Sequence, residues 1–307
     1  MSRVGARLRS LVWSQGTGRV RAVWRVLVPV LTGFLALQLA GAVALTLGVN
    51  RGQMLLAAFA GTTLVMSGVI SVSARYLDRR PLRAYGYSLS REWLFDLVVA
   101  MTFVVARYAG SLRVTSTTLV PDVATLGWLV VFFAAFLGVA FYEEFIYRGA
   151  FVTNAVEGLT ARGVTPPVAT AAALLVSTLA FAFVHLPGAV AADASVALVA
   201  VKTGLLGGLF GVAYIRTGEL ALPMGVHLGV NYALMNVFGI GSAETPGVPT
   251  VVTVEHTATG LWSPARGIPV VVAILAGYVL VFGWTRWRRH DSTTPRTNSV
   301  TRTHSDP

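Results

Sequence analysis

Residues 123–148 read VATLGWLVVFFAAFLGVAFYEEFIYR, and the uncharged run from Val123 to Tyr142 leads directly into two glutamates. About 20 apolar residues are what an α-helix needs to cross the hydrocarbon core of a bilayer. Seven further stretches have the same character, and the third, which contains Asp96, is the weakest of them. The eight predicted spans are residues 26–50, 52–74, 93–106, 123–142, 163–192, 194–215, 220–243 and 267–285.

The composition agrees with a membrane protein. Hydrophobic residues make up 55% of the 307-residue chain and charged residues 12%, with a mean hydropathy of +0.69. Soluble domains carry about 25% charged residues, so a soluble enzyme is excluded. The lack of cysteine excludes disulfide scaffolds, thiolate-bound zinc and iron–sulfur clusters. Because open sheets cannot span lipid, the predicted fold class is an all-α polytopic membrane bundle of about eight transmembrane helices.

The net charge of +11 does not indicate nucleic-acid binding, because the charges lie between and beside the apolar runs. If both ends face the cytoplasm, nineteen arginines lie inside and four outside, a strong positive-inside bias. We therefore expect a multi-pass protein of the cell membrane with both termini cytoplasmic. Residues 40–42 faintly resemble a signal-peptide cleavage site, but the first apolar run exceeds the usual 7–15 residues, which favours an uncleaved helix.

The chain divides into five predicted segments. A basic cytoplasmic segment is followed by the N-terminal transmembrane helices with a basic loop, and then by a catalytic transmembrane core. An external loop and the last helix come next, and a Ser/Thr/Arg/Pro-rich, disordered cytoplasmic tail ends the chain. These segments are residues 1–22, 23–122, 123–243, 244–287 and 288–307.

Ionisable side chains inside membrane spans are costly and indicate function by default. Glu144 and Arg148 are four residues apart and share a helix face, so they can form an ion pair. Glu143 points about 100° away and has no cation nearby in the sequence. A carboxylate without a partner in a low-dielectric site can act as a general base or acid. The alternative is a charge cluster at the membrane interface.

Two histidines fall in later spans. His185 follows Phe181 by four residues, and His227 precedes Asn231 by four, so each pair shares a helix face. A lone histidine on an apolar face is more often a hydrogen-bonded packing residue than a ligand. Together with the glutamates the two histidines offer a base, metal ligands and donors for an oxyanion. Lys202 also lies within a span, where it either extends toward the interface or points into a cavity.

This ordered set of motifs resembles the CPBP family of intramembrane proteases, also called Abi, which includes the type II CAAX prenyl endopeptidases. The family's first motif matches Glu143, Glu144 and Arg148; the second matches Phe181 and His185; the third matches His227 and Asn231. The resemblance covers roughly residues 123–240, and the loop at residues 79–87 also resembles the segment that precedes the family's core.

The resemblance implies a membrane endopeptidase, of metalloprotease type, acting on membrane-anchored, including prenylated CAAX-type, proteins or peptides. It implies that Glu143 activates the water, that His185 and His227 act in catalysis or metal binding, and that Asn231 helps to stabilise the oxyanion. Glu144 and Arg148 complete the first motif. Zinc held by Glu143, His185 and His227 is one possibility, and a metal-free general base is the other. The oligomeric state stays open, and no nucleic-acid partner is expected.

Other classes of membrane protein remain as alternatives. The sequence has no His-Glu-x-x-His helix and no Gly-x-Ser-x-Gly elbow. A transporter or scaffold could use the buried Glu and His groups as a relay, although neither inverted repeats nor paired broken helices are evident. One geometric problem remains for the protease. In simple alternating spans His185 falls near the outer end and Glu143 near the cytoplasmic end, so convergence needs an irregular path near Pro187 and Gly188.

Overall fold

The computed structural model describes residues 11–14, 18–48, 50–112, 117–121, 126–191, 193–240, 247–256, 260–263 and 267–291. The α-helices are α2 (Ala22–Thr46), α3 (Arg51–Val72), α4 (Arg91–Leu112), α5 (Leu126–Glu144), α6 (Thr153–Thr160), α7 (Pro166–Val184), α8 (Leu186–Ala191), α9 (Val196–Thr217), α10 (Ala221–Tyr232) and α11 (Ile268–Asp291). The π-helices are η1 (Ser73–Asp78), η3 (Phe145–Val152) and η4 (Ala233–Val237), and the 3-10 helices are η2 (Leu82–Tyr85) and η6 (Gly260–Trp262).

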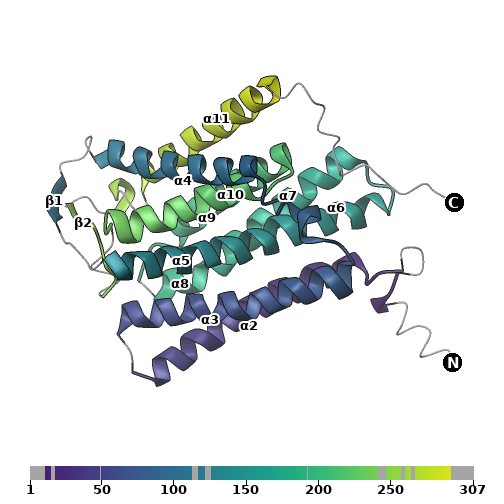
Figure 1. Cartoon of the computed structure of the whole chain (residues 1–307), viewed down its shortest axis with the longest axis horizontal. Helices are drawn as coiled ribbons and strands as arrows, with labels where there is room; N and C mark the ends of the chain where they lie inside the picture. The colour runs from purple at the N-terminus through teal and green to yellow at the C-terminus, as the bar shows by residue number, and fades with distance from the viewer. Residues whose placement is uncertain are drawn as a thin grey trace.

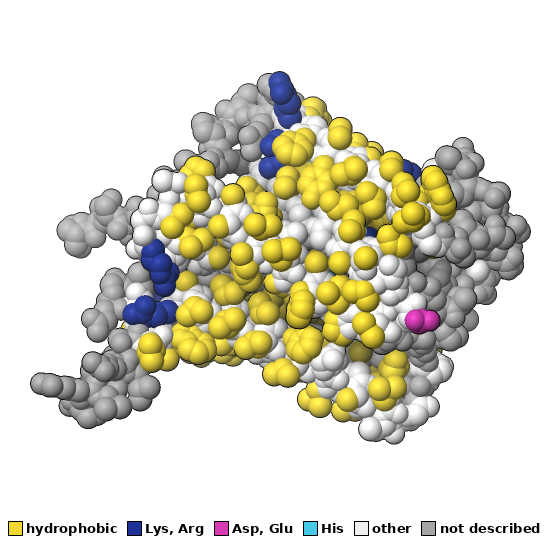
Figure 2. All heavy atoms as spheres, turned by 180° about the vertical axis from the view of Figure 1, so that it is seen from behind, with side chains coloured by type: hydrophobic (Ala, Val, Ile, Leu, Met, Phe, Trp, Pro, Cys, Tyr) yellow, Lys and Arg dark blue, Asp and Glu magenta, His cyan; other side chains and the backbone are white. Residues whose placement is uncertain are grey.

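The predicted all-α membrane bundle is confirmed. Within the described ranges, seven helical stretches are long and apolar enough to cross a membrane. Their exposed surface is rich in apolar side chains, and basic side chains lie toward the edges of the face in Figure 2. The seven stretches are Ala22–Thr46, Gly52–Asp78, Arg91–Gly110, Leu126–Thr160, Pro166–Val190, Val196–Thr217 and Ile268–Arg288.

The predicted span at residues 220–243 differs from the other seven. Its helix, α10, has 12 residues before it passes into η4, which at 1.5 Å per residue gives about 18 Å of α-helix. Most of α10 is buried, because it lies inside the bundle against α4, α5 and α9 (Figure 1). A helix surrounded by protein does not have to match the thickness of the bilayer.

The arrangement of the helices centres on α5. Helices α2 and α3 pack against each other and, through α3, against one side of α5, while α10 packs against α5 from the other side. Helix α7 packs against α9, which also contacts α10 and α11. The start of α2 and the end of α11 point toward the same end of the bundle in Figure 1.

Local signals explain several helix boundaries. Asn50 and Gln53 form a reciprocal capping box at the start of α3. Helix α7 begins with prolines at its first turn, where the missing N–H is not needed. Helix α9 ends at Thr217, and the next residue, Gly218, has a φ of 70°, the left-handed conformation that glycine adopts readily.

Two features depart from the predicted segments. Strands β1 (Thr117–Pro121) and β2 (Val252–His256) pair antiparallel and join the loops before α5 and before α11. Helix α11 continues to Asp291, into the segment predicted to be a disordered tail, so that prediction is wrong for residues 288–291. Residues 1–10 and 292–307 of the predicted terminal segments lie outside the described residues.

A cluster of buried polar side chains joins α2, η1 and α6. Arg25 Nη1 contacts Asp78 Oδ1 at 2.5 Å and donates to Asn154 Oδ1 at 2.7 Å, and its Nη2 contacts Glu157 Oε1 at 3.0 Å. Asn154 Nδ2 donates to Asp78 Oδ2 at 2.8 Å, and the Tyr85 hydroxyl donates to the same oxygen. We call Arg25, Asp78, Tyr85, Asn154 and Glu157 the anchor cluster, because it ties the first helices to the core.

Candidate active site

The two glutamates lie where the backbone changes form. Helix α5 ends at Glu144 and continues as the π-helix η3, and π-helical turns occur frequently at functional sites. Arg148, in η3, donates from Nη1 to Glu144 Oε1 at 3.1 Å. Both side chains are almost completely buried, at 0% exposed for Glu144 and 1% for Arg148. The pair that the spacing predicts is therefore present.

Helix α9 provides the second contact of Arg148. Arg148 Nη2 donates to the Gly207 carbonyl at 2.9 Å. A Cβ atom at Gly207 would lie 3.1 Å from the Phe181 ring, so the glycine allows the two helices to approach. The Arg148 guanidinium also lies 4.5 Å from the centre of the Phe181 ring, within the range of a cation–π contact. Arg148 thus connects η3, α7 and α9.

His227 brings α10 into the site. Its Nδ1 lies 2.8 Å from Glu144 Oε1, and its Nε2 lies 3.8 Å from Glu143 Oε2. The Phe210 ring stacks on the imidazole with a centroid distance of 5.0 Å. Glu144 therefore bridges Arg148 and His227, a second contact that the sequence alone did not predict.

Glu143 keeps more freedom than Glu144. Its side chain is 15% exposed, and its Oε2 is buried without a hydrogen-bond partner among the described residues. The nearest recorded contact of that oxygen is His227 Nε2. A separation of 3.8 Å is too long for a direct hydrogen bond but suits a bridging water.

His185 lies between α7, which ends at Val184, and the short helix α8, which begins at Leu186. Its backbone is right-handed helical, with φ −87° and ψ −14°, so the predicted irregular path is limited to one residue within the stretch Pro166–Val190. His185 Nδ1 lies 2.7 Å from the Phe181 carbonyl oxygen. The Phe181 ring contacts both histidine rings, at centroid distances of 4.6 Å to His185 and 6.0 Å to His227.

Asn231 and Lys202 lie at the margin of this constellation. Asn231 follows His227 by one turn of α10 and is half-buried. Within the described part of the chain, its side chain makes no hydrogen bond to Glu143, Glu144 or His227. Lys202 is half-buried on α9, close enough to His185 to act on it electrostatically.

The ring nitrogens of the two histidines have a definite arrangement. Each histidine has Nδ1 beside an oxygen acceptor, which leaves Nε2 as the free nitrogen, as in many metal-binding histidines. Among the residues that the structure describes, however, no three His, Asp or Glu side chains lie together as a metal site. The described residues as arranged do not make up a three-ligand set of the kind that zinc takes, so zinc stays a prediction and the proposed reaction is written without a metal.

Sequence reasoning missed three residues that build the site. Phe210 stacks on His227, and Gly225 and Gly229 let α10 approach α4. A Cβ atom at Gly225 would lie 2.3 Å from the Leu97 carbonyl oxygen, and one at Gly229 would lie 3.0 Å from the Met101 carbonyl oxygen. The spacing Gly-x-x-x-Gly around His227 is a known signal for close helix packing in membranes, so this contact was readable from the sequence.

A scan against family models matches residues 125–233 to the family described as type II CAAX prenyl endopeptidase Rce1-like. Comparisons with curated proteins and with solved structures give no match. The matched range contains Glu143, Glu144, Arg148, His185, His227 and Asn231. This match agrees with the family resemblance indicated by the three sequence motifs. Residues 125–233 therefore match an Rce1-like domain of the type II CAAX prenyl endopeptidases, which is consistent with the CPBP family.

Proposed function

We propose that this chain is an intramembrane endopeptidase that hydrolyses peptide bonds of membrane-anchored proteins or peptides. The observation that carries the proposal is a pair of atoms inside an Rce1-like domain. Glu143 Oε2 is buried and has no hydrogen-bond partner among the described residues, and His227 Nε2 lies 3.8 Å from it. A water that lies beside this pair, within hydrogen-bond distance of both atoms, has two acceptors and can be deprotonated by the carboxylate.

The proposed reaction follows from these positions. Glu143 takes a proton from the water as its oxygen attacks the carbonyl carbon of the scissile bond. The oxyanion that forms is stabilised by the side-chain N–H of Asn231, because both histidines direct their ring N–H toward Phe181 and Glu144 and present an acceptor at Nε2. Glu143 then returns the proton to the leaving nitrogen as the C–N bond breaks, which regenerates the carboxylate. Glu144 orients the His227 ring by accepting a hydrogen bond from His227 Nδ1. Arg148 balances the charge of Glu144.

The substrate class is part of the proposal. The family model is that of CAAX prenyl endopeptidases, and prenylation of the CAAX cysteine anchors such proteins to the membrane. We therefore propose a lipid-anchored C-terminal peptide as substrate. The purified chain in proteoliposomes should shorten a farnesylated CAAX peptide, which mass spectrometry detects. The same peptide without the farnesyl group tests whether the lipid is needed.

A relay function would give a different result. Proteoliposomes that cleave no membrane-anchored peptide but take up a solute together with protons would overturn the peptidase proposal. A Glu143→Gln variant measured alongside separates cleavage by this site from cleavage by a contaminating protease. Only the contaminant would remain active in that variant.

We also propose that both termini face the cytoplasm of a cell that carries the protein in its plasma membrane. The arginine bias supports this orientation, and α2 begins at the end of the bundle where α11 ends (Figure 1). Reporter fusions after Arg83 and after Pro307 should read as cytoplasmic, and one after Gly188 as external. A cytoplasmic signal at Gly188 would mean that α7 and α8 form a re-entrant segment.

A further inference from the structure

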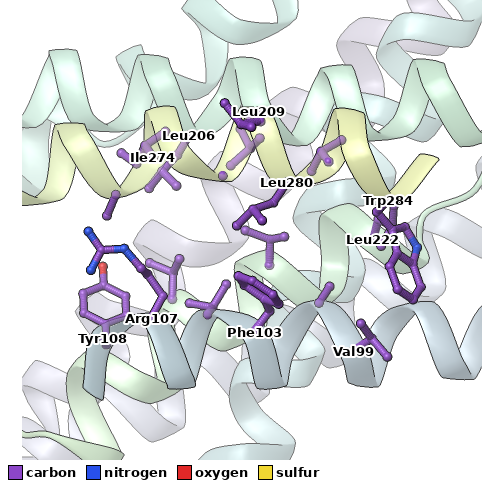
Figure 3. A pocket seen from close by; sticks show the side chains of 18 of the residues that line it. Val99, Phe103, Arg107, Tyr108, Leu206, Leu209, Leu222, Ile274, Leu280 and Trp284 are labelled. Carbon is purple, nitrogen blue, oxygen red and sulfur yellow. The ribbon is translucent and has the colours of Figure 1, made fainter. Parts of the chain in front are cut away.

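An apolar cavity of about 440 Å³ lies between α4, α9, α10 and α11, away from the glutamates (Figure 3). Its volume falls in the range of about 300–1,000 Å³ that is usual for ligand pockets. We call this cavity the lipid slot. The side chains that line it are almost all apolar and include Val99, Phe103, Leu209, Val226, Ile274 and Leu280.

The slot exists because α11 packs closely against α9 and meets α4 at one end. Tyr278 donates to the Leu205 carbonyl at 2.9 Å, which fixes α11 on α9. At the end near the start of α4, Trp284 donates from Nε1 to Asp96 at 3.2 Å and packs on Phe95. Small residues of α11, including Ala273 and Gly283, line the space.

The shape of the slot suits an extended chain. Its lining runs along α4 from Val99 to Tyr108 and along α11 from Val270 to Trp284. The stretch of α11 is about 21 Å long at 1.5 Å per residue, roughly two thirds of the 30 Å hydrocarbon core of a bilayer. Phe103 and Val279 line the slot and are exposed on the surface, so the slot opens toward the surrounding lipid.

The two ends of the slot differ. Trp284 lies at one end, and Arg107 and Tyr108 lie side by side at the other (Figure 3). Arg107 is half-buried, and within the described ranges no carboxylate forms an ion pair with it. A guanidinium at the end of an apolar slot is complementary to a chain that carries an anionic phosphate headgroup.

Helix α10 separates the slot from the candidate active site. Val226 and Val230 face the slot, whereas His227 contacts the two glutamates on another face of the same helix. A lipid attached to a substrate peptide and seated in the slot would have to bring its peptide around α10 to reach Glu143. The geometry therefore favours a lipid of the bilayer over the anchor of a substrate.

We propose that the lipid slot binds one acyl chain of an anionic phospholipid, with the headgroup phosphate held by Arg107. The site is independent of peptide cleavage and would exist whether or not the chain is a peptidase. Occupancy fills the space between α4 and α11, so the bound lipid stabilises the fold as a ligand of the native state.

The test measures phospholipid that stays bound to the delipidated chain in detergent, by native mass spectrometry. Phosphatidylglycerol should be retained about fivefold better than phosphatidylcholine with the same chains, the size expected for one arginine and an anionic lipid. Arg107→Gln should abolish this preference while both lipids still bind. Ala273→Phe should fill the slot and reduce retention of both lipids.

Matched controls keep the proposal open to refutation. Arg91→Gln, at the opposite end of α4, and Leu275→Phe, exposed on α11, do not line the slot and should behave as wild type. Gly283→Leu replaces Ala273→Phe if that variant fails to fold, because no atom lies within 4 Å of a Cβ at Gly283. Unchanged retention in the filled variant, an unchanged preference in Arg107→Gln, or displacement of phospholipid by a farnesylated peptide would each overturn the proposal.

Discussion

The candidate active site and the anchor cluster are both buried sets of charged side chains, and they differ in how their carboxylates are satisfied. Both oxygens of Asp78 and both oxygens of Glu157 accept hydrogen bonds in the anchor cluster. In the candidate active site, Glu143 and Glu144 each keep one buried oxygen without a partner among the described residues. Buried polar atoms are normally paired, so the unpaired oxygens mark a place where water or substrate is expected.

Burial of charge alone therefore does not identify an active site. Arg25 and Asp78, each 3% exposed, are buried nearly as deeply as Arg148, yet the hydrogen bonds of their cluster stay within the protein. Arg25 Nε also lacks a hydrogen-bond partner among the described residues. An unpaired carboxylate oxygen with a second titratable group within a water's reach is what distinguishes Glu143 and His227. Substitutions in the two clusters should therefore separate loss of rate from loss of stability.

The largest effect is expected at Glu143. Glu143→Gln keeps the volume and removes the basic carboxylate, so peptide cleavage should fall by about 10²- to 10⁴-fold, the usual contribution of a general base. Thermal unfolding in detergent should be unchanged, because Glu143 makes no ion pair with an arginine or lysine among the described residues. Cleavage of a quenched membrane-anchored peptide measures the rate.

Glu157→Gln is the matched control, since it makes the same chemical change in the anchor cluster. Glu157 pairs with Arg19, Arg25 and Arg80, so this variant should unfold earlier while each folded molecule keeps its rate. If Glu143→Gln retained full activity, the general base would have to be Glu144.

The next effect is expected at Arg148. Arg148→Ala leaves Glu144 with His227 as its remaining hydrogen-bond partner among the described residues. Removing one partner of a buried ion pair costs about 3–5 kcal/mol. We expect low yield or early thermal unfolding measured in detergent, together with loss of cleavage. A variant with normal melting and full activity would show that the pair is dispensable.

A smaller loss of stability is expected at Asp78. Asp78→Asn removes the negative charge that balances Arg25 but keeps a carbonyl oxygen that can accept a hydrogen bond. We expect a cost of about 3 kcal/mol, the lower end for breaking a buried pair. The rate per folded molecule at a permissive temperature should be unchanged. A loss of rate without loss of stability would place the anchor cluster in the reaction.

The smallest effect is expected at Tyr85. Tyr85→Phe removes the hydrogen bond to Asp78, and a bond to a charged group contributes about 1.5 kcal/mol at the lower end. Burial, followed by the Asp78 carboxylate, raises the pKa of the Tyr85 hydroxyl. A raised pKa in the folded state means that this contribution is present below about pH 10 and is lost as the pH rises further. Wild-type melting should therefore decline more steeply than that of Tyr85→Phe above pH 10.

The helical membrane bundle could be predicted well from the sequence, because each long apolar run is by itself long enough to indicate a transmembrane helix. The sequence also predicted the Glu144–Arg148 pair, because the two residues are one turn apart. It did not predict that His227 contacts Glu144 across 83 positions, since the packing of α10 decides this contact. The short length of α10 was missed for the same reason: apolar residues buried in protein and apolar residues facing lipid look alike in a sequence.

The anchor cluster also could not be predicted from the sequence. Arg25, Asp78 and Glu157 lie at the ends of apolar runs, where arginines and carboxylates are expected to meet headgroups and water. Only the fold shows that they meet each other, over separations of 53 and 132 positions. The strand pair β1–β2 was missed because its two short segments are 135 positions apart and neither has a strong pattern.

The π-helix η3 connects the two clusters within one continuous rod, since Glu144 lies just before it and Asn154 and Glu157 lie just after it. Its wider turn sets the rotation of one cluster relative to the other. Deleting two residues between Phe145 and Val152 would remove more than the one extra residue that a π-turn absorbs, and the second deletion would turn everything beyond it by about 100°. Asn154 would then leave Arg25 and Asp78, although no site residue had been changed. The length of this segment is therefore under a constraint as strict as the identity of the glutamates, and insertions or deletions should be tolerated here far less than substitutions.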